Sequence, residues 1–332
     1  MQGPPQLPET IPVYLAPMAG ITDLPFRHLV SGFGSVRVVS EMIASQDILL
    51  NRPGTRARAE LGFGIENTAV QLAGRDPYWI AEAAKLCEAE GARIIDINMG
   101  CPAKKVTSRS GLGASGSALM REPDLALRLI EAVVGAVKVP VTLKMRLGWD
   151  ENSLNAPELA RRAEAAGVTL ITVHGRTRCQ FYNGEADWAA IARVSRAVQI
   201  PVIANGDITS LSQARCALAA SEARGVMIGR GARGKPWLPG RIAAALNKTR
   251  LPQIPDQAAR VGLVQDHYAA ILDFYGVELG CRAARKHLGW YMDIAGTDKV
   301  LRRRVLTAKC PKEVMRLLPD ALQDDPIEDL AA

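Results

Sequence analysis

The chain has 332 residues, a formal net charge of +7 and 48% hydrophobic residues, which fits one α/β domain of roughly 250 residues with a smaller appendage. It has no apolar run of the about 20 residues that a membrane span needs and no signal-peptide pattern, and its six cysteines are scattered without zinc or disulfide spacing. We therefore expect a cytoplasmic protein with no membrane association, no bound metal and no stable protein partner, whose positive charge favours an anionic ligand.

Short apolar, β-branched runs recur along the chain, each followed by a glycine or polar loop and then by an amphipathic segment. These runs predict strands at residues 12–17, 36–40, 67–72, 93–98, 140–145, 169–174, 201–205 and 225–229. Helices are predicted between them, among others at 77–90, 124–136, 156–166 and 210–220. Asp124 and Ser210 are the expected N-caps of two of these helices. Eight consecutive β/α units favour an α/β fold of the closed (βα)8 TIM-barrel type over an open doubly wound sheet.

The pattern changes after the predicted barrel, which we place at residues 1–248. The turn-rich residues 249–255 predict a linker, and residues 256–320 lack strand patterning and predict a small C-terminal all-α helical domain. The acidic residues 321–332 predict a frayed tail.

Positive charge is concentrated in the predicted helical domain. Residues 281–316 contain ten Lys or Arg against three Asp or Glu, with Trp290 and Tyr291 interleaved. Such a segment is typical of an RNA-binding surface with aromatic stacking faces, or of a solvated helix face whose aromatic rings lie in the core. Both interpretations stay open on these residues alone.

Polar residues follow most of the predicted strands, and in a barrel they converge on the rim at the C-terminal strand ends. The polar residues are Gln71, Asn98, Lys144, Arg146, His174, Arg176, Arg178, Asn205, Asp207 and Arg230. Ala16, Pro17, Met18, Gly206 and Gly229 stand at the same strand ends and let the backbone approach a flat ligand or a phosphate. The last two strand ends are where barrels often bind phosphate through loop amides and a helix N-terminus. A phosphate site combined with Gln71, Lys144 and a Pro–Met wall favours flavin mononucleotide (FMN), because Gln and Lys can bind the edge of its ring system.

The loop after the predicted strand 93–98 contains Cys101 among turn residues and cations. Its neighbours are Gly100, Pro102, Lys104, Lys105 and Arg109. A lone cysteine is more often a small buried residue, but this setting favours a reactive thiol that faces a polyanion. A protonated thiol would be a general acid and a thiolate a nucleophile, and His174 competes for the acid role.

Together these motifs resemble the flavin-dependent tRNA-dihydrouridine synthases, most closely the B-type bacterial branch. The resemblance covers the predicted barrel nearly end to end, through residues 16–23, 70–74, 96–102, 144–146, 174–178, 205–207 and 229–231. In the C-terminal part it is carried by residues 285–291.

The resemblance implies reduction of the C5=C6 bond of a D-loop uridine in tRNA, at position 17 for the B type. It also implies FMN that NADPH or NADH first reduces, hydride transfer to uracil C6, and Cys101 as the acid that protonates C5. From the strand ends and the resemblance together, the expected cofactor contacts are Ala16, Pro17, Met18, Gln71, Lys144, His174, Asn205, Gly206, Asp207, Gly229 and Arg230. The expected contacts with tRNA are Asn98, Lys104, Lys105, Arg109, Arg146, Arg176, Arg178, Arg282, Arg285 and Lys286.

Two other functions are compatible with parts of the sequence. An FMN-dependent barrel that acts on a free pyrimidine or a dihydroorotate-like molecule would share the cofactor site and the loop cysteine, but it gives no role to the basic helices. A non-catalytic RNA-binding protein would use the basic helices, but Cys101, Lys144 and His174 speak against a loss of catalysis.

Overall fold

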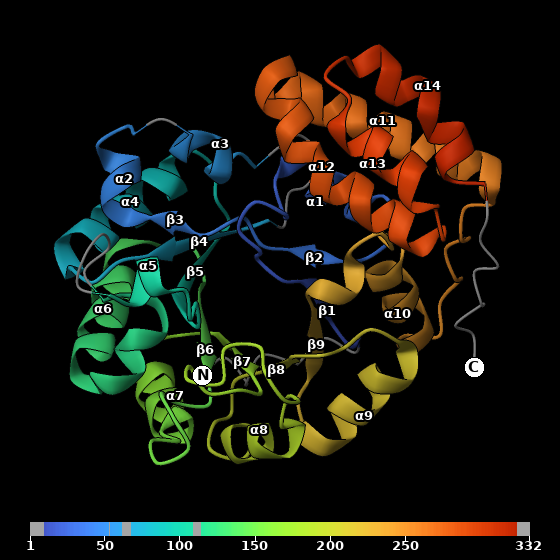
Figure 1. Cartoon of the computed structure of the whole chain (residues 1–332). Helices are drawn as coiled ribbons and strands as arrows, with labels where there is room; N and C mark the ends of the chain where they lie inside the picture. Colours follow the sequence, from blue (N-terminus) through green and yellow to red (C-terminus); the bar gives the residue numbers. More distant parts are fainter. Residues whose placement is uncertain (1–9, 53, 62–67, 109–113, 324–332) are drawn as a thin grey trace.

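The strands of the chain form one parallel sheet that curls into a barrel, as Figure 1 shows. The structure, a computed structural model, describes residues 10–52, 54–61, 68–108 and 114–323. Within these residues the strands are β1 (Val13–Leu15), β2 (Arg37–Val38), β3 (Ile43–Ala44), β4 (Ala69–Ala73), β5 (Ile94–Met99), β6 (Val141–Arg146), β7 (Leu170–His174), β8 (Val202–Asn205) and β9 (Gly225–Ile228). Their order is β2-β1-β9-β8-β7-β6-β5-β4-β3. The predicted α/β barrel is confirmed.

The barrel closes through a strand that is broken in two. The prediction of one strand at 36–40 is therefore incomplete: β2 pairs with β1, whereas the unpredicted β3 pairs with β4. Between them Val39 forms a parallel bridge with Ala69, and the Ser40 amide donates to the Ala69 carbonyl at 2.8 Å. The Ser40 hydroxyl accepts a hydrogen bond from the Gln71 amide at 3.0 Å. The Ser40 side chain thus replaces a backbone acceptor of the sheet where the strand is interrupted. The residue pattern does not reveal this interruption.

The inside of the barrel is apolar below its rim. Tyr14, Val39, Ala69, Ile203 and Met227 belong to one buried cluster contributed by strands on opposite sides of the ring. Larger apolar clusters fill the space between the strands and the surrounding helices. Because the lower interior is packed with side chains, an open site can form only at the strand ends.

Helices surround the strands, and most begin as their sequences indicate. They are α1 (Leu24–Ser31), α2 (Ser45–Leu49), α3 (Thr55–Ala59), α4 (Pro77–Ala89), α5 (Lys104–Thr107), α6 (Pro123–Ala136), α7 (Ala156–Ala165), α8 (Trp188–Ser195), α9 (Leu211–Ser221) and α10 (Leu238–Leu246), with 3-10 turns η1 (Gly116–Arg121) and η2 (Arg230–Ala232). Ser210 caps α9 by accepting from the Gln213 amide at 3.1 Å, as predicted. The N-cap expected at Asp124 is wrong. Pro123 already occupies the first turn of α6, and the Asp124 carboxylate pairs with Arg162 at 2.7 Å.

Four further helices pack together beside the barrel, at the upper right of Figure 1: α11 (Gln257–Tyr275), α12 (Val277–Ile294), α13 (Lys299–Thr307) and α14 (Pro311–Ala321). They share a separate apolar core that includes Val264, Leu288 and Leu317. Gly276, with a φ of +74°, joins α11 to α12 in a single-residue turn, and α11 contacts α1 of the barrel.

Of the predicted acidic tail, Ala321 and Leu322 are buried in the helical core, and residues 324–332 lie outside the described residues. None of the helices in the described part is both long and apolar enough to cross a bilayer.

The contact between β9 and β1 predicts a stability effect. A Cβ at Gly225 would collide with the Pro12 carbonyl oxygen, which accepts the Val226 amide at 3.1 Å, and would lie 3.0 Å from Ile203. We expect Gly225→Ala to lower the free energy of unfolding by about 1–3 kcal/mol, measured as a lower thermal midpoint in calorimetry. Gly262→Ala is the control, because no atom lies within 4 Å and alanine favours a helix interior. Equal midpoints for Gly225→Ala and wild type would contradict the close approach.

Candidate active site

The predicted polar residues of neighbouring strands meet at the C-terminal rim of the barrel. In the sheet register Asn98 of β5 lies beside Lys144 of β6, and His174 of β7 lies beside Asn205 of β8. Gln71 of β4 joins them, since its side-chain oxygen accepts from Asn98 Nδ2 at 2.7 Å. The tertiary structure therefore brings together side chains that are widely separated in the chain.

A buried carboxylate that the sequence reasoning missed lies beneath this group. Asp96 accepts hydrogen bonds from Gln71 Nε2 at 2.7 Å and from the Thr142 hydroxyl at 2.6 Å. Burial raises the pKa of Asp96, which the hydrogen bonds from Thr142 and Gln71 and the charge of Lys144 oppose. An acidic residue inside an otherwise apolar strand was the available signal. Gln71, only 1% exposed, is thereby fixed in place at the floor of the site.

The loop that carries Cys101 is shaped by its own hydrogen bonds. The side-chain oxygen of Asn98 accepts from the backbone amides of Gly100 at 3.1 Å and Cys101 at 2.9 Å. The Ser117 hydroxyl, which the sequence reasoning did not single out, donates to the Cys101 carbonyl at 2.8 Å. Gly116 has a φ of +59°, and a Cβ there would lie 2.8 Å from the same carbonyl. The loop holds the partly exposed Cys101 thiol directly after β5.

Lys144 is a buried cation at the centre of the rim. Its ammonium donates to Asn205 Oδ1 at 3.0 Å, and only 8% of the residue is exposed. Burial lowers the pKa of Lys144 to about 8, with a further contribution from the positive charge of Arg146. An ammonium has three donors, so Lys144 can bind a second acceptor besides Asn205.

Arg146, which was predicted to contact tRNA, is buried, with only 1% of its surface exposed. Its Nε donates to the Gly100 carbonyl at 2.9 Å, and one terminal nitrogen donates to the carbonyls of Thr177 and Phe181 at 2.7 Å each. These bonds connect the cysteine loop to the loop after β7. In the described structure Arg146 positions both loops.

Arg176 is also buried, and it binds other residues of the rim. It binds both carboxylate oxygens of Asp207, at 3.0 and 2.5 Å, and one of its nitrogens lies 3.2 Å from His174 Nε2. Burial alone would raise the pKa of Asp207, but the hydrogen bonds from Arg176 and the Ala186 amide lower it. Burial, with the charges of Arg146 and Lys144, moves the pKa of His174 well below its ordinary value. His174 is therefore neutral near pH 7.

The loops after β1, β8 and β9 form the other side of the rim. A Cβ on Gly229 would lie 3.6 Å from Ala16 Cβ and 3.7 Å from Met18 Sδ, and Pro17 lies between these two residues in the chain. Gly206 and Asp207 both have positive φ, at +124° and +53°. Arg230, which is exposed at the start of η2, donates to Asp207 at 3.1 Å. Gly229 thus lies close to the side chains of Ala16 and Met18, and the exposed Arg230 follows it in the chain.

An exposed aromatic ring that was not predicted covers part of the rim. Tyr182 is 53% exposed, and the guanidinium groups of Arg146 and Arg230 lie 5.4 and 5.1 Å from the centre of its ring. Its ring centre is 6.3 Å from that of His174. Tyr182 lies in an irregular loop, where no periodic pattern of residues could have predicted its position at the rim.

The cations expected to contact tRNA lie in two places. Lys104 and Lys105 are exposed on α5 beside the cysteine loop, and Arg178 packs between the rings of Trp149 and Phe181 at 4.7 and 4.6 Å. Its terminal nitrogen donates to Thr107 of α5 at 3.1 Å. Arg109 lies outside the described residues.

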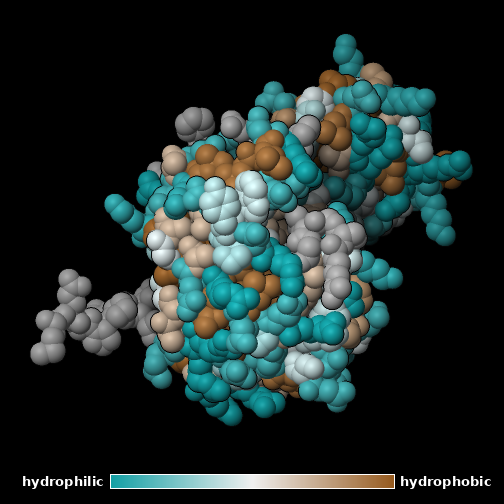
Figure 2. Space-filling view, turned by 90° about the vertical axis from the view of Figure 1, so that its left-hand side faces the viewer, coloured by the Kyte–Doolittle hydropathy of each residue, from teal (hydrophilic) through white to brown (hydrophobic). Residues whose placement is uncertain are grey.

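The second group lies on α12. Arg282 and Arg285 are exposed there, and hydrophilic side chains cover much of the helical part on the face shown in Figure 2. Lys286 points elsewhere, since a Cβ on Gly20 of the barrel would be 3.0 Å from its Nζ. The structure thus separates two solvent-facing cations from one that faces the barrel.

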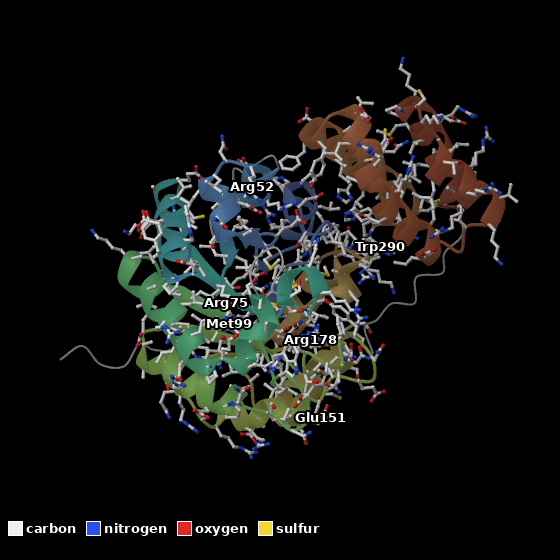
Figure 3. The ribbon with its side chains drawn as sticks, turned by 60° about the vertical axis from the view of Figure 1, so that its left-hand side comes forward. Arg52, Arg75, Met99, Glu151, Arg178 and Trp290 are labelled. Atoms are coloured by element: carbon white, nitrogen blue, oxygen red, sulfur yellow. The ribbon has the colours of Figure 1, made fainter. Side chains whose placement is uncertain are left out.

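The interpretation of Tyr291 as a stacking face is wrong. The residue is 2% exposed, and its hydroxyl lies 3.0 Å from His267 Nδ1. Trp290 lies where the helices meet the barrel, as Figure 3 shows, and its ring faces Arg233 at 4.9 Å. The spacing of α12 directs Tyr291 into the core and Trp290 toward the barrel.

A separate cavity of about 210 Å³ lies between α9, α10 and residues 251–254. It is lined by Trp237, Arg241 and Leu251 among others, and it includes none of the predicted site residues that the structure describes.

The fold and the rim together define the class of protein: a parallel-barrel enzyme whose rim places a loop thiol beside a buried cation. The family model described as "Dihydrouridine synthase (Dus)" matches residues 14–325. The chain belongs to this family, which confirms the resemblance seen in the sequence.

The relatives agree with this assignment. A "Probable tRNA-dihydrouridine synthase" of Rhodobacter capsulatus is 58% identical over 315 residues, which cover 94% of this chain and 95% of that protein. The "tRNA-dihydrouridine synthase B" of Pseudomonas aeruginosa is 46% identical over 288 residues, covering 86% and 85%. The second relative supports the predicted B-type resemblance.

Two solved structures share the fold. Morphinone reductase has a TM-score of 0.51 at 14% identity, covering 75% of this chain and 90% of that one. A 2-naphthoyl-CoA reductase has a TM-score of 0.54 at 12% identity, covering 71% and 50%. At these identities the similarity concerns the barrel architecture alone.

The burial of Lys144 predicts a pH dependence of stability. A lysine in the unfolded chain keeps its proton up to about pH 10.4, whereas folded Lys144 releases it near 8. Between these values the unfolded chain binds more protons, so the free energy of unfolding rises with pH. We expect this rise between about pH 8 and 10 in the cofactor-free protein, and we expect it to be absent in Lys144→Met. Urea unfolding midpoints measured at several pH values test both expectations. The same pH increment in both proteins would argue against a depressed pKa.

Proposed function

We propose that this protein reduces the C5=C6 bond of a D-loop uridine in tRNA, with FMN as its cofactor and NADPH as the reductant that regenerates it. The observation that carries the proposal is the Cys101 thiol, held by Asn98 and Ser117 at the rim beside buried Lys144, in a chain of the dihydrouridine synthase family. The family and the basic helices favour tRNA over a free pyrimidine. The B-type resemblance indicates position 17 of the D-loop.

The residues at the rim fit a flavin with a terminal phosphate. Ala16, Met18 and Gly229 lie close together and would form the wall against which a flat ring packs, and Lys144 offers a cation with two further donors. The phosphate would be held by the loops after β8 and β9, at Gly206 and the exposed Arg230. We assign cofactor binding to these residues together with Pro17, Gln71, His174, Asn205 and Asp207. A bound, reduced flavin supplies the hydride that the reaction needs.

Proton delivery is assigned to Cys101. Reducing a C=C bond requires one proton in addition to the hydride, and the partly exposed thiol can donate it to uracil C5 and then regain it from water. His174 competes for this role, but its lowered pKa leaves it neutral and therefore a weaker acid near pH 7. Asn98 and Arg146 position the thiol, because the first binds the Cys101 amide and the second binds the Gly100 carbonyl.

The substrate base must leave its stack to reach the rim, which requires contacts to the RNA on either side. Lys104 and Lys105 on α5 provide exposed cations next to Cys101, and Arg178 reaches α5 from the loop after β7. Arg109, which lies outside the described residues, and Arg176, which is buried against Asp207, complete the proposed set. We propose residues 256–320 as a tRNA-binding helical domain, joined to the barrel domain 1–248 by the linker 249–255. On it, the exposed Arg282 and Arg285 are the proposed contacts, whereas Lys286, which was also expected to bind tRNA, faces Gly20 of the barrel.

Nucleoside analysis tests the reaction and the role of Cys101. Purified protein with NADPH and unmodified tRNA should form dihydrouridine, detected and located by mass spectrometry of nuclease fragments. We expect Cys101→Ala to retain its flavin absorbance and to lose activity by about 10²–10⁴-fold, because the proton donor is missing. Cys179→Ala, which removes an exposed thiol, should retain full activity. Wild-type rates in Cys101→Ala would reject Cys101 as the acid, and no product from wild type would reject the function.

The exposed cations on α12 predict a salt-dependent effect on binding. We expect the double variant Arg282→Ala and Arg285→Ala to weaken tRNA binding and to reduce the slope of log K against log salt by roughly one for each phosphate that these arginines neutralise. NADPH-dependent flavin reduction should be unchanged. Lys85→Ala, on barrel helix α4, removes an exposed cation as a control. Unchanged affinity and slope in the double variant would exclude this face as the RNA surface.

A further inference from the structure

Three side chains of the kind that bind metal ions meet where the helices join the barrel. Asp23 precedes α1, His267 lies on α11 and His287 lies on α12. One ligand atom from each residue lies within 4.8 Å of the others. The three residues are 2%, 3% and 2% exposed, so the cluster is closed to bulk water.

The two histidines have nitrogen atoms without a partner. His267 Nε2 and His287 Nε2 are buried and make no hydrogen bond. Their ring centres are 4.9 Å apart, and Phe26 packs against both at 5.7 and 5.1 Å. A buried polar atom without a partner is unfavourable, and two in one cluster that also contains a carboxylate indicate a shared ligand.

The other nitrogen of His267 supports this interpretation. His267 Nδ1 lies 3.0 Å from the Tyr291 hydroxyl. We assign the proton to Nδ1, which leaves the lone pair of the unpartnered Nε2 free to bind a metal ion. Histidines that bind metal usually donate their second ring N–H in this manner, which fixes the tautomer and the orientation of the ring.

The carboxylate is also held in place. Asp23 Oδ1 accepts from the Phe26 amide at 3.1 Å as the N-cap of α1, and the Tyr275 hydroxyl of α11 bonds to the same carboxylate. Glu41 is buried nearby and repels its charge, whereas Lys286 attracts it. A carboxylate retains free lone pairs after two such bonds, so Asp23 can still bind a cation.

We propose that Asp23, His267 and His287 bind one divalent transition-metal ion that ties α11 and α12 to the loop after β1. Two imidazoles and a carboxylate suit Zn²⁺, with water in the fourth position. Bonds of about 2.0–2.1 Å place tetrahedral ligands about 3.3 Å apart, so small side-chain rotations are sufficient. The site differs from the sequence-based expectation of no metal, because its three ligands come from separate segments.

The same loop carries Pro17 and Met18 toward the rim, and its Gly20 lies against Lys286 of α12. A metal at Asp23 therefore fixes the basic helix relative to the rim. This role is structural, since the cluster is enclosed and none of its three residues belongs to the loop of Cys101.

Metal binding by the wild-type protein is the primary test. The flavin-containing protein is dialysed against a chelator and titrated with Co²⁺, whose visible absorption reports nitrogen ligands and coordination number. We expect saturation at one Co²⁺ per chain, displacement by Zn²⁺ and a higher thermal midpoint with metal bound. No saturable binding at this stoichiometry would overturn the proposal, and this measurement does not depend on any variant folding.

Variants locate the site. His267→Gln and His287→Gln should each weaken Co²⁺ binding by more than about 100-fold. Removing a residue that only supports a metal ligand weakens metal binding by at most about 100-fold, so a larger loss identifies a direct ligand. His28→Gln is the matched control, because His28 is exposed on α1 next to the cluster, and its affinity should equal that of wild type. Wild-type affinity in both cluster variants, or a weaker affinity in His28→Gln, would place the metal elsewhere.

Discussion

The site depends on the way the protein compensates buried positive charge at the mouth of the barrel. Arg146 and Arg176 are each 1% exposed, and their donors bind loop carbonyls and the Asp207 carboxylate. Breaking such a buried pair leaves a charge or a carbonyl without a partner, which costs more than the bond itself contributes. These bonds therefore hold the loops after β5, β7 and β8 in one arrangement. Cys101 owes its position to that arrangement.

This constraint explains how one rim can combine binding and proton transfer. Lys144 is buried yet keeps donors available, and burial, together with the charges of Arg146 and Lys144, lowers the pKa of His174 and keeps it neutral. In the proposed reaction the Cys101 thiol is the acid, and its loop is fixed through the backbone while its side chain stays partly exposed. Of the side chains predicted as substrate contacts, Lys104 and Lys105 are exposed, whereas Arg146 and Arg176 hold the loops.

In the proposed function, the helices beside the barrel bind the part of the tRNA that lies outside the rim. Their core is separate, but α11 rests on α1, and Arg233 of the barrel faces Trp290 of α12. The Asp23, His267 and His287 cluster lies in this junction. A rigid junction matters for a folded RNA, because the distance between the basic helix and Cys101 selects which base can reach the rim.

The sequence by itself determined the eight-unit barrel, the strand ends that carry the site and the cysteine loop, because strand periodicity and Gly-rich turns are local properties. It also indicated the family through motifs at those strand ends. Only the tertiary structure decided which cations are free. Arg146 is buried and Lys286 faces the barrel, although the exposed Arg282 and Lys104 have the same residue types, because different elements pack against them. The burial of Tyr291 has the same cause. The break in the strand at 37–44 was likewise invisible, since it follows from pairing with β1 on one side and β4 on the other. The Asp96 network and the two-histidine cluster were invisible because each is made by residues far apart in the chain.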